Sequence, residues 1–402
     1  MTTLSRRVLL GRLAAAAALA GLPRLSLAAA ATDRRLVVVI LRGALDGLAA
    51  VPPYGDRDYR AARGGLALAA PGSADGIVDL DGFFGLNPAL APLHDFYARR
   101  ELLVVHAVAT PYRDRSHFDG QDLLENGTAT PHQASSGWLN RAIGLMQGAD
   151  RTTGLAVGQT VPLLLRGAMP VSSWAPSRLP ALDDAFLDKV ADLYRGDPLF
   201  AQALAESERS HGLAQQTLGD DARPMMGGDR AQLVKAVAGD AGKLLAAEDG
   251  PRVAVLEAYG WDTHANQGTD KGRLTTALAG LADGLTALAA GCGPAWGKTV
   301  VLAITEFGRT VAMNGTAGSD HGTASVALLL GGAVAGGKVV GTWPGLAADR
   351  LYQGRDLAPT GDLRAVAKAV LVGHLGLPRA AVEGAVFPRS AKVAALPQLL
   401  RA

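Results

Sequence analysis

The chain contains Thr299-Val-Val-Leu-Ala-Ile-Thr-Glu-Phe-Gly-Arg-Thr310, in which an apolar run ends abruptly in charged residues. The first half is rich in β-branched residues, a pattern typical of a strand buried on both faces of a parallel sheet. Glu306 and Arg309 follow the run, and Asp320 and His321 come after a short glycine-containing loop. Because α/β proteins bind their ligands at the carboxyl ends of such strands, the segment predicts an α/β fold with a polar site at one sheet edge.

The same pattern of an apolar run followed by polar residues occurs three more times. One run begins at Leu36 and leads to Asp46, and a second covers Leu102–Ala109 and leads to Ser116 and His117. The third begins at Arg252 and leads to Asp262-Thr-His264. Four polar clusters in the same position after four strands are expected to converge on one edge of one sheet.

The residue types in these clusters favour a divalent metal site. Asp262 and His264 stand on alternate residues, so both side chains can point the same way. A carboxylate and a neutral imidazole are typical zinc ligands, and the downstream pair Asp320-His321 makes a site the better interpretation than two isolated surface residues. Asp46 is a further candidate ligand, although an aspartate after a strand also commonly caps a turn or helix. Glu306 is another, with a plain ion pair to Arg309 as the alternative.

Ser116 and His117 lie where a helical pattern over residues 117–126 begins. Backbone N–H groups at a helix start favour an anion, so a phosphate or sulfate could rest there against a nucleophilic hydroxyl. Ser116 as a simple N-cap is the alternative. The sequence has no Gly-x-Ser-x-Gly elbow, no Walker loop and no Gly-x-Gly-x-x-Gly after the first strand, which disfavours Ser-His-Asp hydrolases and nucleotide cofactors.

The first 31 residues read as an export signal. Paired arginines in Ser5-Arg-Arg-Val-Leu-Leu10 precede an alanine-leucine stretch and small residues suited to cleavage. The apolar run is short for a membrane span and is interrupted by Pro23 and Arg24. We therefore expect a twin-arginine signal peptide over residues 1–31, a periplasmic or secreted protein, the twin-arginine export machinery as a partner, and no stable membrane span.

The remainder, residues 34–402, is interpreted as one α/β domain with a helical insertion at about 175–250, where Ala, Leu, Glu and Lys recur at helical spacing. Before the insertion we expect a helix over 89–100 and strand-like pieces over 155–157 and 162–166, and within it helical stretches over 183–212 and 229–248. Beyond it we expect a helix over 274–290, strands over 299–304 and 325–330, and a last helix over 362–375. The 39 basic and 37 acidic residues give a net charge of +2 without a long basic run after the leader, so nucleic acid is not expected as a partner. The lone Cys292 can form no internal disulfide.

Five blocks together resemble the signature of the exported DUF1501 family of the alkaline phosphatase-like superfamily. They are Arg42-Gly-Ala-Leu-Asp46-Gly, Ser116-His-Phe-Asp119, Gly260-Trp-Asp-Thr-His264, Thr305-Glu-Phe-Gly-Arg309 and Asp320-His-Gly322. The resemblance implies a three-layer α/β/α sandwich with a mostly parallel central sheet. It also implies one or two divalent metals at the strand ends and a nucleophile at a helix start.

Carried over residue by residue, the resemblance makes Asp46 the first-strand metal ligand and Ser116 the nucleophile, with adjoining His117 as the other candidate for that place. Asp262, His264 and His321 would form one metal site. Glu306 stands where many relatives have an Asp followed by His, so Phe307 removes one ligand of a second metal unless Asp320 replaces it.

These expectations combine into an exported metal-dependent hydrolase of a phosphate or sulfate ester. Ser116 would attack a small-molecule or glycan ester, while the metal and Arg309 stabilise the developing charge. Zinc is the first choice of metal, with calcium, magnesium or manganese as alternatives. The alternative function is a non-catalytic cell-envelope binding protein on a degenerate site of the same fold.

Overall fold

The computed structural model describes residues 32–176, 184–198, 200–201, 204–205, 212, 214, 216–218 and 230–401. The predicted signal peptide over residues 1–31 and part of the predicted insertion lie outside the described residues. The remaining predictions on secondary structure and site residues fall on the described part.

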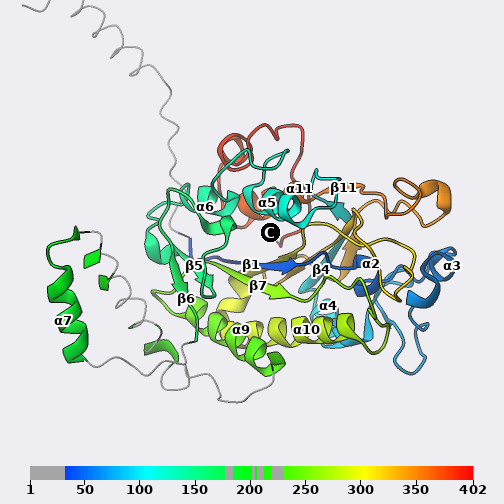
Figure 1. Cartoon of the computed structure of the whole chain (residues 1–402), viewed down its shortest axis with the longest axis horizontal. Coiled ribbons are helices and arrows are strands. Elements are labelled where there is room, and N and C mark those ends of the chain that lie inside the picture. The colour runs from blue at the N-terminus through cyan, green and yellow to red at the C-terminus, as the bar shows by residue number, and fades with distance from the viewer. Residues whose placement is uncertain are drawn as a thin grey trace, which may run out of the picture.

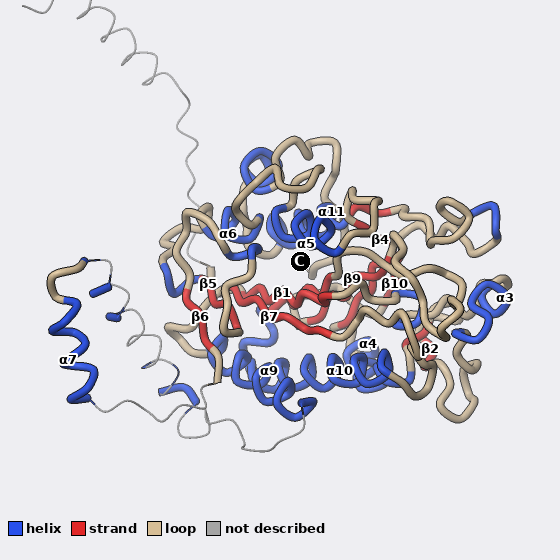
Figure 2. Tube along the Cα trace, in the orientation of Figure 1, coloured by secondary structure: helices blue, strands red, loops and turns tan. Residues whose placement is uncertain are grey.

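A large mixed sheet forms the centre of the protein (Figures 1 and 2). Its hydrogen-bonded order is β10-β4-β9-β8-β1-β7-β5-β6, and β11 also pairs with β4. Only β9 runs against its neighbours, β4 and β8, among the described strands of this sheet, and the other pairs are parallel. The strands are β1 (Arg35–Arg42), β4 (Leu102–Ala109), β5 (Gly154–Val157), β6 (Ser172–Trp174), β7 (Val253–Tyr259), β8 (Thr299–Ile304), β9 (Ser325–Leu330), β10 (Lys338–Val340) and β11 (Gly361–Asp362).

The apolar runs became strands because helices cover both faces of the sheet. Successive side chains of a strand point to opposite faces. In β1, Val37 and Val39 therefore join one apolar cluster with Leu278 of α10, and Val38 and Ile40 join a second cluster. A strand buried on both sides needs an unbroken apolar run, which is what the sequence shows.

Figures 1 and 2 show the two layers of helices. On one face lie α5 (His117–Asn126), α6 (Trp138–Ile143) and α11 (Leu363–Gly373), and on the other lie α4 (His94–Ala98), α9 (Arg230–Ala246) and α10 (Arg273–Cys292). This confirms the predicted three-layer α/β/α architecture with a mostly parallel sheet. The smaller helices are α2 (Gly47–Ala50), α3 (Tyr59–Arg63), α7 (Asp184–Tyr194) and α12 (Arg379–Ala381), and β2 (Val78–Asp79) pairs with β3 (Gly85–Leu86).

Some local predictions need correction. Residues 162–166, which we interpreted as strand-like, contain a 3-10 turn at Leu163–Leu165, and the helix predicted near residues 89–100 is a 3-10 segment Pro88–Leu93 followed by the short α4. The helical pattern near residues 229–248 is confirmed as α9, which packs along α10 in the layer beneath the sheet. The boundaries of an insertion at about 175–250 stay a prediction.

One helical segment of the described chain, Arg273–Lys298, is long and apolar enough to cross a membrane by length and composition alone. In the fold its leucines Leu278, Leu281 and Leu285 belong to the apolar cluster between the helices and the sheet. The apolar character of α10 is thus used for packing against β1 and α9.

Candidate metal centre

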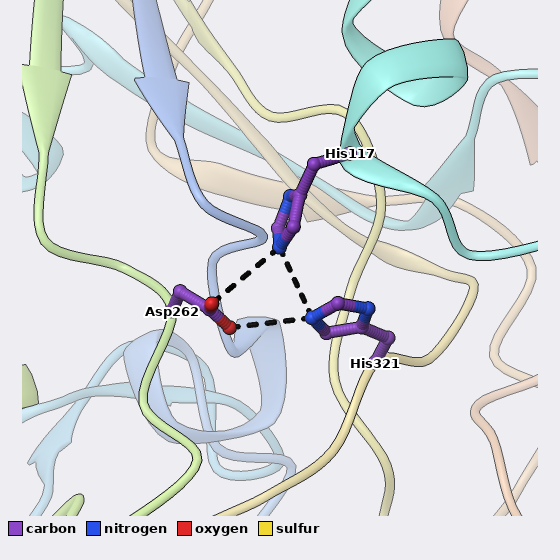
Figure 3. Close-up of side chains that lie close together, drawn as sticks. All are labelled: His117, Asp262 and His321. Atoms are coloured by element: carbon purple, nitrogen blue, oxygen red, sulfur yellow. Dashed lines mark hydrogen bonds and ion pairs between the residues drawn. The ribbon is translucent and has the colours of Figure 1, made fainter.

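Three predicted site residues meet at the carboxyl edge of the sheet (Figure 3). His117 is the first residue of α5, Asp262 follows β7, and His321 lies in the loop between β8 and β9. Their potential ligand atoms all lie within 4.8 Å of one another. The convergence inferred from the apolar runs is therefore present for three of the four strand ends.

The backbone around Asp262 is held by close packing. Trp261 is buried and its indole donates to the Ala258 carbonyl at 2.9 Å. Gly43, just after β1, has a φ of 120°, and a Cβ there would lie 2.9 Å from the Asp262 nitrogen. A glycine is required at this position because both the backbone angle and the contact exclude a side chain.

Each histidine ring of the site is oriented through its Nδ1 atom. His117 Nδ1 lies 2.8 Å from Glu306 Oε1, and His264 Nδ1 lies 3.0 Å from Asp320 Oδ1. His321 Nδ1 lies 2.8 Å from the Arg115 carbonyl oxygen, which can only accept a hydrogen bond. In the neutral form, all three rings therefore carry their proton on Nδ1 and a lone pair on Nε2.

The Nε2 atom of His321 faces the Nε2 atoms of both other rings. His321 Nε2 lies 3.0 Å from His117 Nε2 and 2.9 Å from His264 Nε2. In each of these two pairs the facing lone pairs repel each other unless a proton or a cation lies between them. Histidines that donate Nδ1–H to a carboxylate or carbonyl while presenting Nε2 are the usual arrangement around a bound metal.

Asp262 adds oxygen to this nitrogen cluster. Its Oδ1 lies 3.0 Å from His264 Nε2 and 3.3 Å from His321 Nε2. The same oxygen accepts a hydrogen bond from Arg309 Nη1 at 2.5 Å. Burial alone would raise the pKa of the Asp262 carboxyl, but the hydrogen bond and charge of Arg309 outweigh burial and hold the pKa below its usual value. The three residues whose ligand atoms lie close together, His117, Asp262 and His321, supply the carboxylate and imidazole donors that zinc prefers.

Glu306 orients the imidazole ring of His117. Its side chain is fully buried, and Oε1 accepts from the Gly43 amide at 2.9 Å and from Gln121 Nε2 at 3.1 Å besides facing His117. Burial would raise the pKa of Glu306, but the hydrogen bond from His117 and its other donors keep the pKa below the usual value. The hydrogen bond to Glu306 in turn raises the pKa of His117.

Arg309 and Asp320 also surround the cluster. Arg309 is buried and donates to both the carbonyl and the hydroxyl of Ser319, which fixes its guanidinium beside Asp262. Asp320 accepts from His264 and, at 3.0 Å, from Asn314 Nδ2. Both residues lie at the cluster through a single side-chain contact: Arg309 with Asp262, and Asp320 with His264.

Asp46, predicted as a metal ligand, makes its contacts away from the histidine cluster. Asp46 caps α2 through the amides of Leu48 and Ala49, and its Oδ2 accepts from Arg63 Nη2 at 2.6 Å and from Gln267 Nε2 at 2.7 Å. Each oxygen thus accepts from two donors, which is the cap alternative, and the role of Asp46 as a metal ligand stays a prediction.

Ser116 occupies the N-cap position of α5 with extended backbone, and its side chain caps no amide of the described helix. Its own amide donates to the Tyr112 hydroxyl at 3.2 Å. The structure thus brings His117 into the cluster and leaves Ser116 beside it. Sequence reasoning placed His117 only among candidate nucleophiles. Its place as the first residue of α5, beside the buried Glu306, makes His117 a candidate metal ligand, which becomes visible only once the fold is known.

Residues 103–386 match the family model described as "Protein of unknown function (DUF1501)". The chain belongs to this family. The matched region of this DUF1501 protein contains His117, Asp262, His264, Glu306 and His321, whereas β1 and Asp46 lie before it. No curated protein matches the sequence significantly.

Solved structures share parts of the DUF1501 chain's shape at low similarity. The C-terminal periplasmic domain of EcEptC from Escherichia coli, in complex with Zn, is 9% identical with a TM-score of 0.37, covering 75% of this chain and 73% of that one. Ps i-CgsB in complex with k-i-k-neocarrahexaose is 12% identical with a TM-score of 0.40, covering 90% and 77%. The phosphonate monoester hydrolase of Agrobacterium radiobacter is 13% identical with a TM-score of 0.34, covering 86% and 74%.

Proposed function

We propose that this DUF1501 protein is an exported, metal-dependent hydrolase of a phosphate or sulfate ester. The observation that carries the proposal is the cluster of His117, Asp262 and His321, with His264 Nε2 lying 2.9 Å from His321 Nε2 and 3.0 Å from Asp262 Oδ1. Nitrogen donors that are fixed in the Nδ1–H form by separate partners are preorganised for a cation. A divalent ion held there would act as a Lewis acid, polarising the ester and neutralising charge on the transferred group.

The residues around the centre have separate roles in this proposal. Arg309 balances the charge of Asp262 and would favour an anionic substrate group. Ser116, half-buried at the start of α5, is the proposed nucleophile, and the amides of that helix end favour the negative charge of the group it attacks. Export through the twin-arginine pathway remains part of the proposal and rests on the leader sequence.

A non-catalytic binding protein is the second candidate function, and the contacts of Asp46 favour it. Asp46 is committed to α2, Arg63 and Gln267, and Glu306 is committed to orienting donors. Two of the carboxylates that the sequence analysis considered as metal ligands are therefore engaged by protein donors, whereas Asp262 lies in the cluster. A degenerate centre of this kind could hold a ligand in the cell envelope without turnover.

Metal content decides first between the two functions. The full chain purified from the periplasm is analysed for zinc, calcium, magnesium and manganese beside a His264→Ala/His321→Ala double variant, with the exposed His132→Ala as the matched control. We expect near-stoichiometric metal in the parent and the control and none in the double variant. A parent that stays as empty as the double variant after incubation with each metal overturns the hydrolase proposal.

Hydrolysis of 4-nitrophenyl phosphate and 4-nitrophenyl sulfate then tests the reaction. Activity that requires the metal and falls at least about a hundredfold in Ser116→Ala supports the assigned nucleophile, in line with typical losses of a catalytic group. Metal-dependent activity that is unchanged in Ser116→Ala removes Ser116 from the mechanism. A metal-loaded protein that turns over neither ester favours the binding protein.

A further inference from the structure

A cavity of about 580 Å³ adjoins the candidate metal centre. Its walls come from α3, from the loop after β8 and from the segment Leu346–Arg355. The lining is mainly apolar, with Val311, Met313, Leu346 and Leu351 among its side chains. Cavities of about 300–1,000 Å³ with apolar walls and a few polar groups are typical of small-molecule sites.

The three walls are tied to one another by buried hydrogen bonds. Arg63 of α3 is fully buried and donates from Nη1 to the Val311 carbonyl at 2.9 Å and to the Thr310 carbonyl at 3.2 Å. The Val311 amide donates to the Arg355 carbonyl at 3.0 Å. A cavity whose walls are linked in this way exists before a ligand arrives, which lowers the entropic cost of binding.

Two residues of the cavity lining make hydrogen bonds to histidines of the metal centre. Asp320 lines the cavity and accepts the Nδ1 hydrogen bond of His264. Arg355 also lines the cavity, and its Nη2 donates to the His321 carbonyl at 2.7 Å. The Arg355 side chain is 44% exposed although Asp356 and His321 hold it in place. A guanidinium fixed at this boundary is suited to an anionic group lying between the cavity and the histidines.

Met313 gives the cavity an adaptable apolar surface. Its side chain is 44% exposed and lines the cavity, and a flexible thioether can adjust to apolar groups of different shape. The acidic residues Asp58 and Asp320 are also in the lining, so the charged part of an anionic ligand is expected beside Arg355 and not deep in the cavity. The apolar walls then receive an uncharged, hydrophobic group.

We propose that this cavity binds the hydrophobic group of an anionic monoester whose charged end lies at the candidate metal centre, beside Arg355. The inference rests on the proposed function and narrows its substrate class to esters of aryl or alkyl alcohols. An alcohol rich in hydroxyl groups, such as a sugar, would leave many of its hydrogen bonds unmade against these walls.

Isothermal titration calorimetry of the zinc-loaded full chain tests the inference with three probes: methylphosphonate, 4-phenylbutylphosphonate and the neutral 4-phenylbutanol. We expect the phenylbutyl compound to bind at least about tenfold more tightly than methylphosphonate because its chain buries apolar area. Ala348→Trp places bulk at an exposed residue of the cavity lining, and Ala391→Trp, at an exposed residue outside the lining, is the matched control. Met313→Ala is the second variant, which removes apolar wall without adding volume.

The preference should disappear in Ala348→Trp, weaken in Met313→Ala and persist in Ala391→Trp, with zinc content unchanged in all three. Equal affinity for both phosphonates, or a preference retained in Ala348→Trp, overturns the inference. If neither phosphonate binds in a zinc-dependent manner, the proposed function fails, and 4-phenylbutanol then decides on the cavity. Binding of 4-phenylbutanol that is lost in Ala348→Trp would support the apolar site, and absence of binding would contradict it.

Discussion

His117 Nε2 and His321 Nε2 lie 3.0 Å apart although both rings are directed by acceptors to carry their proton on Nδ1. The rings come from the start of α5 and from the loop after β8, so 204 residues of sequence separate them. Nothing in local sequence dictates such a contact. Two lone pairs facing each other at this distance are stable only with a shared proton or cation between them, which gives the metal hypothesis a direct consequence for stability.

Zinc should stabilise the folded protein. At a free concentration of 100 times Kd, a ligand that binds only the native state adds about 2.7 kcal/mol to the free energy of unfolding. Differential scanning calorimetry after chelator treatment, with and without added zinc, measures the effect as a rise in Tm. His321→Gln should show no rise, and His132→Gln should respond as the parent does. A parent whose Tm does not depend on zinc contradicts the site.

Glu306→Gln should weaken metal binding without removing a direct ligand. The carboxylate is fully buried and accepts from His117 Nδ1, so its charge strengthens that ring as a ligand. Loss of such an orienting carboxylate typically costs about 10–100-fold in metal affinity. The measurement is a competition titration against a chromophoric zinc chelator. Asp320→Asn is the comparison, and we expect a smaller loss because the Asp320 side chain is 52% exposed and its charge is screened. Equal zinc affinity in Glu306→Gln and the parent would argue against the orienting role.

Asp46→Asn should affect stability and leave metal content unchanged. Asp46 and Arg63 form an ion pair in which both side chains are buried, and the neutral amide would leave the Arg63 charge without its partner. Breaking a buried pair from one side typically costs about 3–5 kcal/mol. Urea unfolding measures this loss, and elemental analysis measures zinc. Asp262→Asn is the opposite case, with zinc lost and a smaller effect on unfolding. Loss of zinc from a folded Asp46→Asn protein would restore Asp46 as a ligand.

The twin-arginine prediction is tested on the leader itself. Replacement of Arg6 and Arg7 by lysine keeps the charge and changes only the guanidinium pair. We expect the full-length protein to accumulate in the cytoplasm, as measured by immunoblotting of cell fractions, while a Lys substitution at Arg12 leaves export unchanged. Unaltered delivery of the double variant to the periplasm would point to another route.

The sequence predicted the strands well because each is buried on both faces and therefore requires an uninterrupted apolar run. β4 and β8 coincide with the runs Leu102–Ala109 and Thr299–Ile304. Strand direction could not be predicted in the same way. β9 is as apolar as its neighbours, and its antiparallel placement depends on a connection from β8, residues 305–324, that contains no helix to cross over the sheet, and on pairing with β4.

The sequence predicted the location of the site because polar residues that follow parallel strands gather at one edge of the sheet. That pattern did not predict which of these residues contact one another. Asp262 and His321 follow strands and reach the cluster, and so does His117 at the start of α5. Asp46 occupies an equivalent position after β1, yet it caps α2. An aspartate side chain can accept from helix amides as readily as it can bind a cation. The choice between these roles depends on Arg63 and Gln267, which are distant in sequence and donate to the same carboxylate.

Acid should destabilise the protein through two buried histidines that lie outside the metal centre. His106 Nε2 donates to the Val51 carbonyl at 2.9 Å, and its Nδ1 accepts from the Ala107 amide at 2.9 Å, so a protonated ring would set two N–H groups against each other. Burial lowers the pKa of His106 to about 4. Burial also lowers the pKa of His374 to about 4, against its hydrogen bond to the Arg35 carbonyl.

The sign of the effect follows from proton uptake. Between the ordinary pKa of 6.5 and the folded value of about 4, the unfolded chain binds more protons than the native state, so stability falls as pH falls through this window. A shift of this size corresponds to about 3 kcal/mol for each histidine. Urea unfolding from pH 7 to pH 4 should therefore show a flatter pH dependence in His374→Gln, and a flatter one still when His106→Asn is added. Because protons and a bound metal would compete for the histidines of the metal centre, parent and variants are compared in chelator. An unchanged slope in both variants would mean that these rings are already protonated in the native state, against the hydrogen bonds that hold them.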